Sequence, residues 1–223
     1  MILTRYLYPK HNVEYSLANA LFKKDSEQAK FWAYELYYSG FIDETINLLR
    51  YFCDNYYKNK NYKIFNNEKN ENNVGIIIEN IILMVPNIKK IEEDFGIIID
   101  PFIKKKKLII IYDNTLQKYK TKPIVLTKCW KIPRNVCIYN CQKSPNSTDL
   151  NIDLYVNYWL YYASGCPLWK NRIEKFGGII NHEKKEVSFP TDINEEKFYN
   201  MYNMEPDEQP LFVQNNWLGK NNQ

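Results

Sequence analysis

Apolar positions recur at helical spacing through the first quarter of the chain. The i, i+3, i+4, i+7 pattern of an amphipathic helix occurs in three stretches, which are residues 13–21, 29–37 and 46–56. Asn12 is placed to cap the first stretch, and Asp25 opens a capping-box pattern ahead of the second. Gly40 stands where a left-handed residue commonly ends a helix, and Asp43 can start the third helix. The pattern therefore predicts an antiparallel helical module over residues 1–58.

The second of these helices carries two apolar stripes. Trp32 belongs to the first stripe. The second stripe, on another side of the helix, is aromatic throughout and consists of Phe31, Tyr34 and Tyr38. A helix that is apolar on two sides is either sandwiched between two neighbours, which we favour, or leaves an aromatic face for a partner.

The segment after the third helix is polar and rich in asparagine. Residues 59–73 are predicted to form a loop or linker. From residue 74 to residue 85 the apolar positions return to helical spacing and predict a helix, although the many β-branched side chains leave a buried strand open.

The pattern then changes to short β-rich runs separated by prolines. These runs lie between residues 96 and 140 and predict a small sheet. Helical spacing resumes after Asn151, and Pro167 restarts a shorter helix at its favoured first position. In residues 179–189 apolar and polar positions alternate on either side of a polar turn, and this pattern predicts a β-hairpin. Asp192 opens a capping-box pattern for a last helix.

These patterns together predict an α+β fold that is predominantly α-helical. It combines an N-terminal antiparallel helical module, a small central basic β-sheet, and C-terminal helices with one β-hairpin. The expected divisions are a helical module, an Asn-rich linker, an α+β part and an extended acidic and apolar tail, at residues 1–58, 59–73, 74–203 and 204–223.

Charge is unevenly distributed along the chain. Residues 101–143 contain ten lysines and one arginine against a single acid, although the formal net charge of the chain is only +4. Such a segment could contact nucleic-acid phosphates, and the candidate residues are Lys104, Lys105, Lys106, Lys107, Lys128 and Arg134. Lysine also protects solvated sheet edges, and 28 Asn, 26 Ile and 26 Lys are typical of AT-rich coding. Both interpretations stay open.

Motifs for catalysis and metal binding are weak. Cys137 and Cys141 have a spacing seen in zinc sites, but the chain contains only two histidines, both far away in sequence. Cys166 at a helix start and His182 could form a nucleophile and its base, yet a buried, inert cysteine is the favoured interpretation. Glycine-rich phosphate loops are absent from the sequence. We predict no catalytic residue, no metal site and no cofactor, and the sequence favours a non-enzymatic protein while leaving the question open.

The sequence also bears on the compartment. No stretch reaches 18 consecutive apolar residues, so no membrane span is predicted. The first residues lack the apolar core of a signal peptide. Five scattered cysteines fit a reducing compartment. We therefore expect an intracellular protein that is not secreted and does not bind a membrane.

The predicted tail places acidic residues and prolines ahead of a short apolar group. This group contains Phe212 and Trp217. Such a segment can dock on its own domain or add to a groove or edge of another protein, and the sequence does not choose between the two.

Three phrases of the sequence point to a known group of proteins. They are RYLYPKHNVEYSLANALFKKDSEQAKFWAYELYYSGF at residues 5–41 and, later, WLYYASGCPLW and FYNMYNMEPDEQ. These phrases resemble uncharacterised proteins encoded by nucleocytoplasmic large DNA viruses, notably the mimivirus-like ones. The resemblance implies infected-cell cytoplasm, a virus factory or the virion as the setting. It carries over no catalytic residue.

The sequence as a whole favours a non-enzymatic viral accessory or scaffold protein that acts through protein–protein binding. The expected contact residues are aromatic side chains of the second helix and the tail, namely Trp32, Tyr34, Tyr38, Phe212 and Trp217. The alternative is a nucleic-acid-binding protein that uses the basic segment 101–143 in viral replication, transcription or packaging. The sequence fixes neither the protein partner nor the oligomeric state.

Overall fold

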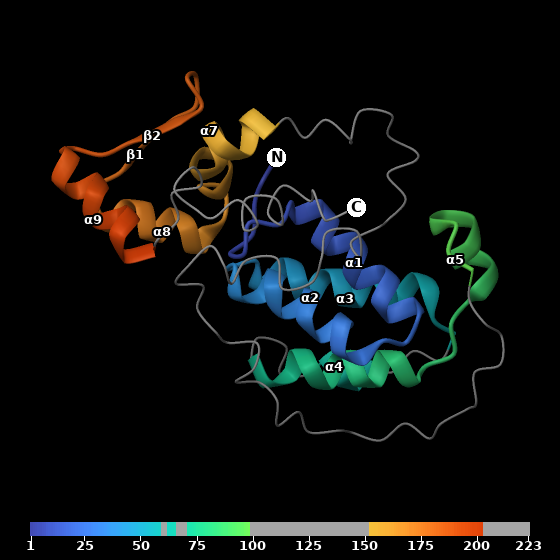
Figure 1. Cartoon of the computed structure of the whole chain (residues 1–223). Coiled ribbons are helices and arrows are strands. Elements are labelled where there is room, and N and C mark those ends of the chain that lie inside the picture. The colour runs from blue at the N-terminus through green and yellow to red at the C-terminus, as the bar shows by residue number, and fades with distance from the viewer. Residues whose placement is uncertain (59–61, 66–70, 99–151, 203–223) are drawn as a thin grey trace. The chain divides into compact units, whose positions relative to one another are not determined.

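The computed structural model describes residues 1–58, 62–65, 71–98 and 152–202 (Figure 1). The described residues are mostly helical and include a two-stranded antiparallel sheet, which confirms the predicted α+β class with helices in the majority. The chain forms two compact units, which we describe separately. The helical unit is Val13–Thr121, and the mixed unit combines Met1–Asn12 with Lys122–Gln223.

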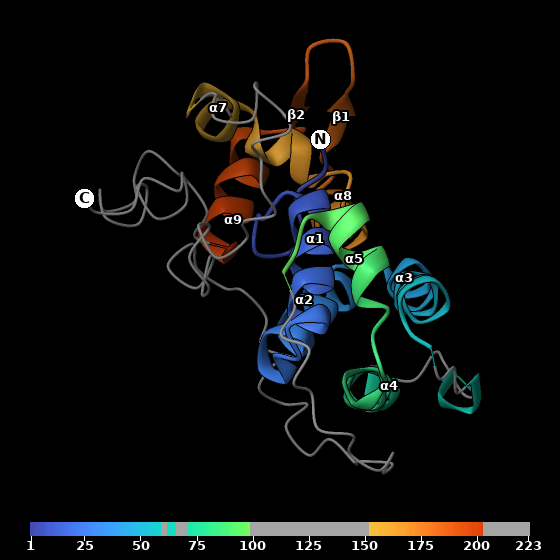
Figure 2. The same ribbon diagram turned by 90° about the vertical axis from the view of Figure 1, so that its right-hand side faces the viewer.

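The helical unit is built around its second helix. Its elements in chain order are α1 (Lys10–Phe22, whose first turn belongs to the mixed unit), α2 (Ser26–Tyr38), α3 (Ile42–Tyr56), the short 3₁₀ helix η1 (Tyr62–Phe65), α4 (Glu71–Leu83) and α5 (Ile88–Phe95). α2 packs against both α3 and α4, which also contact each other (Figure 2). Because α4 packs on the helices before the Asn-rich segment, that segment does not separate two compact units.

The ends of α2 follow the predicted chemistry. The Asp25 side chain accepts a hydrogen bond from the Gln28 amide at 3.1 Å, as expected of an N-cap. At the other end Gly40 has a φ of 97°, and the Phe41 amide donates to the Leu36 carbonyl at 3.2 Å. This arrangement is a Schellman motif, in which only glycine adopts the left-handed position without steric cost.

The first helix begins earlier than predicted. α1 starts at Lys10, and the Asn12 amide already donates to the Pro9 carbonyl at 2.9 Å. Asn12 therefore lies inside the first turn instead of capping it. The predicted start of the third helix is also displaced, since Ile42 is its first residue and its N-cap, Phe41, makes no side-chain hydrogen bond.

The two elements described between α3 and α5, η1 and α4, both contribute buried residues. The apolar residues of α4 form a fully buried stripe in spite of their β-branched side chains, which confirms the predicted helix; they are Val74, Ile77, Ile78 and Ile81. Part of the predicted linker is also packed. Phe65 of η1 is buried, and the Arg50 guanidinium lies 4.9 Å from the centre of its ring.

The mixed unit contains the hairpin and the last helices. Its elements are α7 (Ile152–Ala163), α8 (Pro167–Lys175), β1 (Ile179–Asn181), β2 (Glu186–Ser188) and α9 (Asp192–Tyr202). Pro167 occupies the predicted start of α8. The strands pair antiparallel with Ile180 opposite Val187, which confirms the hairpin. The prediction for α9 was wrong by one residue: the Asn194 amide donates to the Thr191 hydroxyl, so Thr191 and not Asp192 caps the helix.

The N-terminal residues belong to the core of the mixed unit. The Leu3 amide donates to the Tyr162 carbonyl at the end of α7 at 3.1 Å. Ile2 lies so close to Gly165 that a Cβ atom there would meet the Ile2 side chain at 3.1 Å. Leu7 is fully buried although its φ is 64°, a left-handed value that is rare for leucine. The packing of Leu7 therefore stabilises a strained turn.

Two predicted segments cannot be compared with the structure. Gly96 ends α5, and the remainder of the predicted basic sheet beyond Ile98 lies outside the described residues. The predicted tail, residues 204–223, also lies outside them. Within the described parts of the chain, no helix has the length and apolar character needed to cross a membrane.

Candidate functional site

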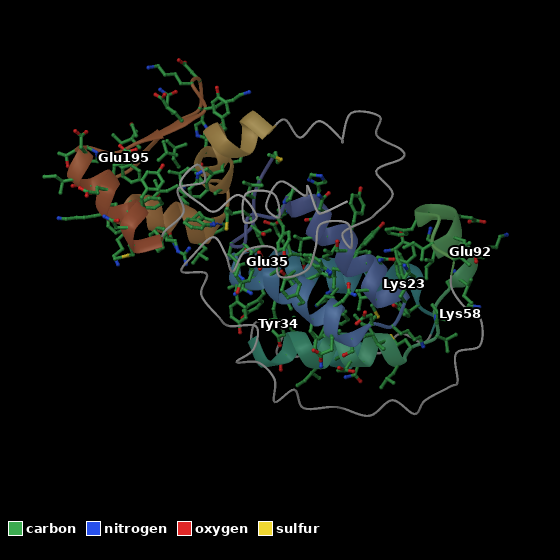
Figure 3. All side chains as sticks on the ribbon, viewed as in Figure 1. Lys23, Tyr34, Glu35, Lys58, Glu92 and Glu195 are labelled. Atoms are coloured by element: carbon green, nitrogen blue, oxygen red, sulfur yellow. The ribbon has the colours of Figure 1, made fainter. Side chains whose placement is uncertain are left out.

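The predicted aromatic contacts of α2 are mainly buried. Trp32 and Tyr34 are fully buried, whereas Tyr38 is half-buried and stacks on Tyr34 at 5.6 Å between ring centres. The Tyr34 hydroxyl accepts a hydrogen bond from the Gly75 amide of α4 at 3.0 Å, so this side chain faces α4 (Figure 3). The sandwiched interpretation of α2 is confirmed. In the folded unit only Tyr38 of the three retains surface that a partner could contact.

The other predicted binding residues lie outside the described parts of the chain. They are Phe212 and Trp217 of the tail and the basic residues Lys104, Lys105, Lys106, Lys107, Lys128 and Arg134. The structure neither gathers nor separates them.

The weak cysteine hypothesis finds no geometric support. Cys166 is fully buried at the N-cap of α8. His182 is exposed in the hairpin turn, where its Nδ1 atom lies 3.3 Å from the Tyr161 hydroxyl. The favoured interpretation, a buried cysteine, is confirmed. Among residues 1–58, 62–65, 71–98 and 152–202, no three acidic, histidine or cysteine side chains group to hold a metal ion.

A partly exposed aromatic surface lies on α7 and the neighbouring hairpin. We call Tyr158, Tyr161, Tyr162 and His182 the tyrosine patch. Tyr158 is 37% exposed, Tyr161 and Tyr162 are half-buried, and His182 is exposed. The Tyr161 ring lies 5.3 Å from the Tyr162 ring and 5.9 Å from the His182 ring, both edge to face. The four side chains thus extend from one turn of α7 to the next and onto the hairpin.

The inward side of α7 explains why these rings face outward. Trp159, Leu160 and Ala163 are buried, and the Trp159 ring packs edge to face on buried Trp169 at 5.6 Å. The helix contacts β2 as well, which places His182 beside Tyr161. Tyr158 and Tyr162 are one turn apart, so they continue the outer face that Tyr161 shares with the hairpin.

Sequence reasoning missed this surface because it assigned α7 a single buried stripe. The signal was present in the phrase NYWLYYASG, residues 157–165, where aromatic residues occupy more than one side of a helix. The same signal in α2 was recognised, but there a second neighbour, α4, covers the rings. Aromatic spacing predicts an apolar face and does not reveal whether the chain itself covers it.

A second polar and aromatic cluster joins α5 to α3. The Tyr56 hydroxyl donates to Asp94 at 2.9 Å, and Lys90 forms an ion pair with the same carboxylate at 3.0 Å. The hydrogen bond from Lys90, followed by that from Tyr56, holds the pKa of Asp94 below its ordinary value. Burial, aided by hydrogen bonds with Tyr51 and Asp94, raises the pKa of Tyr56 far above its ordinary value. Both shifts favour an ionised carboxylate that accepts from a neutral phenol.

The chain was also compared with known proteins. No protein-family model, no curated protein and no solved structure matches it, so the assignment of function rests on the residues themselves.

Proposed function

We propose that this chain is a non-enzymatic accessory or scaffold protein that acts by binding another protein, and that the tyrosine patch is its contact surface. The viral setting implied by the sequence resemblance is part of the same proposal. The observation that supports it is a set of three tyrosines and one histidine that remain partly exposed on a folded helix and the hairpin beside it.

Tyrosine is well suited to such a surface. Its ring offers a large apolar area, and its hydroxyl tolerates water in the free protein and can form hydrogen bonds in a complex. It has only two side-chain torsions, so a contact orders few degrees of freedom. In the tyrosine patch the edge-to-face contacts already restrict Tyr161 from two sides. A partner would therefore meet a preformed surface, and this lowers the entropic cost of binding.

Two apolar side chains of the same unit are also accessible. Ile179 at the start of β1 is 64% exposed, and Ile2 is partly exposed beside Gly165. Exposed apolar side chains are characteristic of interaction sites when they form a patch. Lys184 of the turn and Glu186 of β2 form an exposed ion pair at 3.8 Å and would belong to a polar rim.

The proposal is tested by site-specific photocrosslinking in cells that produce the full chain. A benzophenone amino acid replaces Tyr158 in one variant and Tyr15 of α1 in a control variant, because Tyr15 is similarly exposed at 42%. We expect a discrete crosslinked protein from position 158 and none of the same mass from position 15.

A second variant checks that this product depends on the patch. Tyr161→Ala in the position-158 background removes the central ring and should abolish the crosslink, while the circular dichroism spectrum of the purified protein stays unchanged. Identical products from both crosslinker positions, or a crosslink that survives Tyr161→Ala, would contradict the proposal.

A further inference from the structure

α8 and α9 pack through an aromatic cluster that holds one arginine. Trp169 of α8 is fully buried, and its ring lies edge to face with that of Tyr202 in α9, 5.7 Å between ring centres. Arg172, one turn later in α8, is only 9% exposed. Its Cζ atom lies 4.5 Å from the centre of the Trp169 ring and 4.6 Å from the centre of the Tyr202 ring. The two rings therefore hold the guanidinium in the corner between them.

These ring contacts fix the position of the guanidinium without using its hydrogen-bond donors. The attraction to an aromatic face acts through the positive charge, whereas the N–H groups lie in the plane of the guanidinium. Their fork-like geometry matches the two oxygens of a carboxylate. Because Arg172 is largely removed from water, a hydrogen bond from it to an anion is stronger than it would be at an exposed position.

The indole of Trp169 adds a second donor to the same place. Its Nε1 atom is buried and donates to no acceptor within the part of the chain that the structure describes. A buried tryptophan N–H usually has an acceptor, because leaving it without one costs free energy. The Arg172 guanidinium lies over this same ring, so a group with two acceptor oxygens has the size to meet both donors.

From these two donors we infer that α8 and α9 form a binding site for the carboxylate of an acidic side chain. One oxygen accepts from Trp169 Nε1, and the carboxylate pairs with the Arg172 guanidinium. A phosphate group fits less well, since it carries more charge and three acceptor oxygens. The site contains no residue of the tyrosine patch, so the inference is independent of the proposed function.

The carboxylate has two possible sources. The first is the chain itself, because Glu205, Asp207 and Glu208 follow Tyr202 within six positions. Three residues span at most roughly 10 Å, and a tethered group has a high effective concentration. The second source is an acidic segment of a partner protein. Both sources place the same chemical group on the same donors, and the two arms of one experiment distinguish them.

The test measures the indole N–H of Trp169 by ¹H–¹⁵N NMR of the full chain, with Trp169→Phe to identify the resonance. The first arm neutralises the acids beyond α9 in the triple variant Glu205→Gln, Asp207→Asn and Glu208→Gln. If the chain supplies the carboxylate, the Trp169 resonance should shift and its N–H should exchange with water at least about tenfold faster, because a charged acceptor is lost. The Trp32 resonance, from the helical unit, is the internal control and should not move.

The second arm titrates the unaltered chain with an acetylated tetraglutamate peptide, and the corresponding tetraglutamine peptide is the matched control. If a partner supplies the carboxylate, tetraglutamate alone should shift the Trp169 resonance to saturation. Arg172→Lys should then weaken binding at least about tenfold, because lysine lacks the planar fork.

A response in either arm supports the inference and identifies the source of the carboxylate. The first arm alters no residue of the aromatic cluster, so the test does not depend on the folding of a core variant. A Trp169 resonance that responds in neither arm would overturn the inference. A response to tetraglutamate that Arg172→Lys leaves unchanged would also overturn it.

Discussion

An ion pair between α2 and α4 gives the sharpest test of how the helical unit is stabilised. Lys30 Nζ lies 2.5 Å from Glu79 Oε1, and the two side chains are only 9% and 15% exposed. The Ser26 hydroxyl donates to the same carboxylate oxygen. The pair therefore joins two helices within a largely dehydrated contact.

Removal of one charge should be costly, and removal of both should not. Breaking a buried pair leaves the other charge poorly solvated and costs roughly 3–5 kcal/mol when burial is complete. Since both side chains retain some exposure, we expect Lys30→Met or Glu79→Leu alone to cost about 2–3 kcal/mol. The double variant replaces the pair with apolar side chains of similar volume and should lie within about 1 kcal/mol of the unaltered protein.

The assay is urea unfolding of all four proteins, followed by circular dichroism and tryptophan fluorescence. For an m-value of about 2–3 kcal/mol per molar, each single change shifts the midpoint by about 1 M. The double-mutant cycle should give a coupling free energy of at least about 2 kcal/mol. Single variants that each cost less than about 1 kcal/mol, or a double variant destabilised by the sum of both, would refute the reasoning.

Three further predictions concern single positions. Lys185 in the hairpin turn has a φ of 56°. Lys185→Gly should raise the free energy of unfolding by about 1 kcal/mol because glycine adopts a left-handed backbone without steric cost. A lower melting temperature of the variant would contradict this prediction. Tyr34→Phe removes the acceptor for the Gly75 amide and should cost about 1–2 kcal/mol. The measurement is urea unfolding, with Tyr158→Phe at a 37% exposed position as the control, which should cost less than about 0.5 kcal/mol. Asp94 has a lowered pKa in the folded protein, so its contribution is present above the unfolded value of about 3.9 and is lost as pH falls through the folded one. Protection of α5 amides should accordingly decrease from pH 5 to pH 3 by NMR, and the Asp94→Asn variant should show no such decrease.

Local chemistry explains which elements were predictable. Asp25, Gly40 and Pro167 specify helix ends through their own side chains or backbone, and each acts as expected. Asn181 accepts hydrogen bonds from the amides of Glu183 and Lys184, both at 3.0 Å, so the hairpin turn is also encoded locally. Features that depend on neighbours a few residues apart are thus readable from the sequence.

The errors arose where distant contacts decide the outcome. α5 was not predicted because its short sequence gains stability from Phe22 and Tyr56, which are remote in the chain. Trp32 and Tyr34 were predicted as partner contacts because the sequence does not show that both side chains are buried, Tyr34 against α4. For the same reason the outward rings of α7 were overlooked. Burial is a property of the assembled fold, whereas spacing describes a single element.

The attachment of the N-terminal residues to α7 has a consequence for biosynthesis. Leu3 is bonded to the main chain of Tyr162, a residue that the ribosome adds about 160 positions later. At a synthesis rate of roughly 5–20 residues per second, Tyr162 is added about 8–32 s after Leu3. During that interval Leu3, fully buried in the finished protein, lacks the α7 main chain to which its amide donates. The nascent N-terminus therefore exposes apolar side chains. We expect a chaperone to bind it until the second half of the chain emerges.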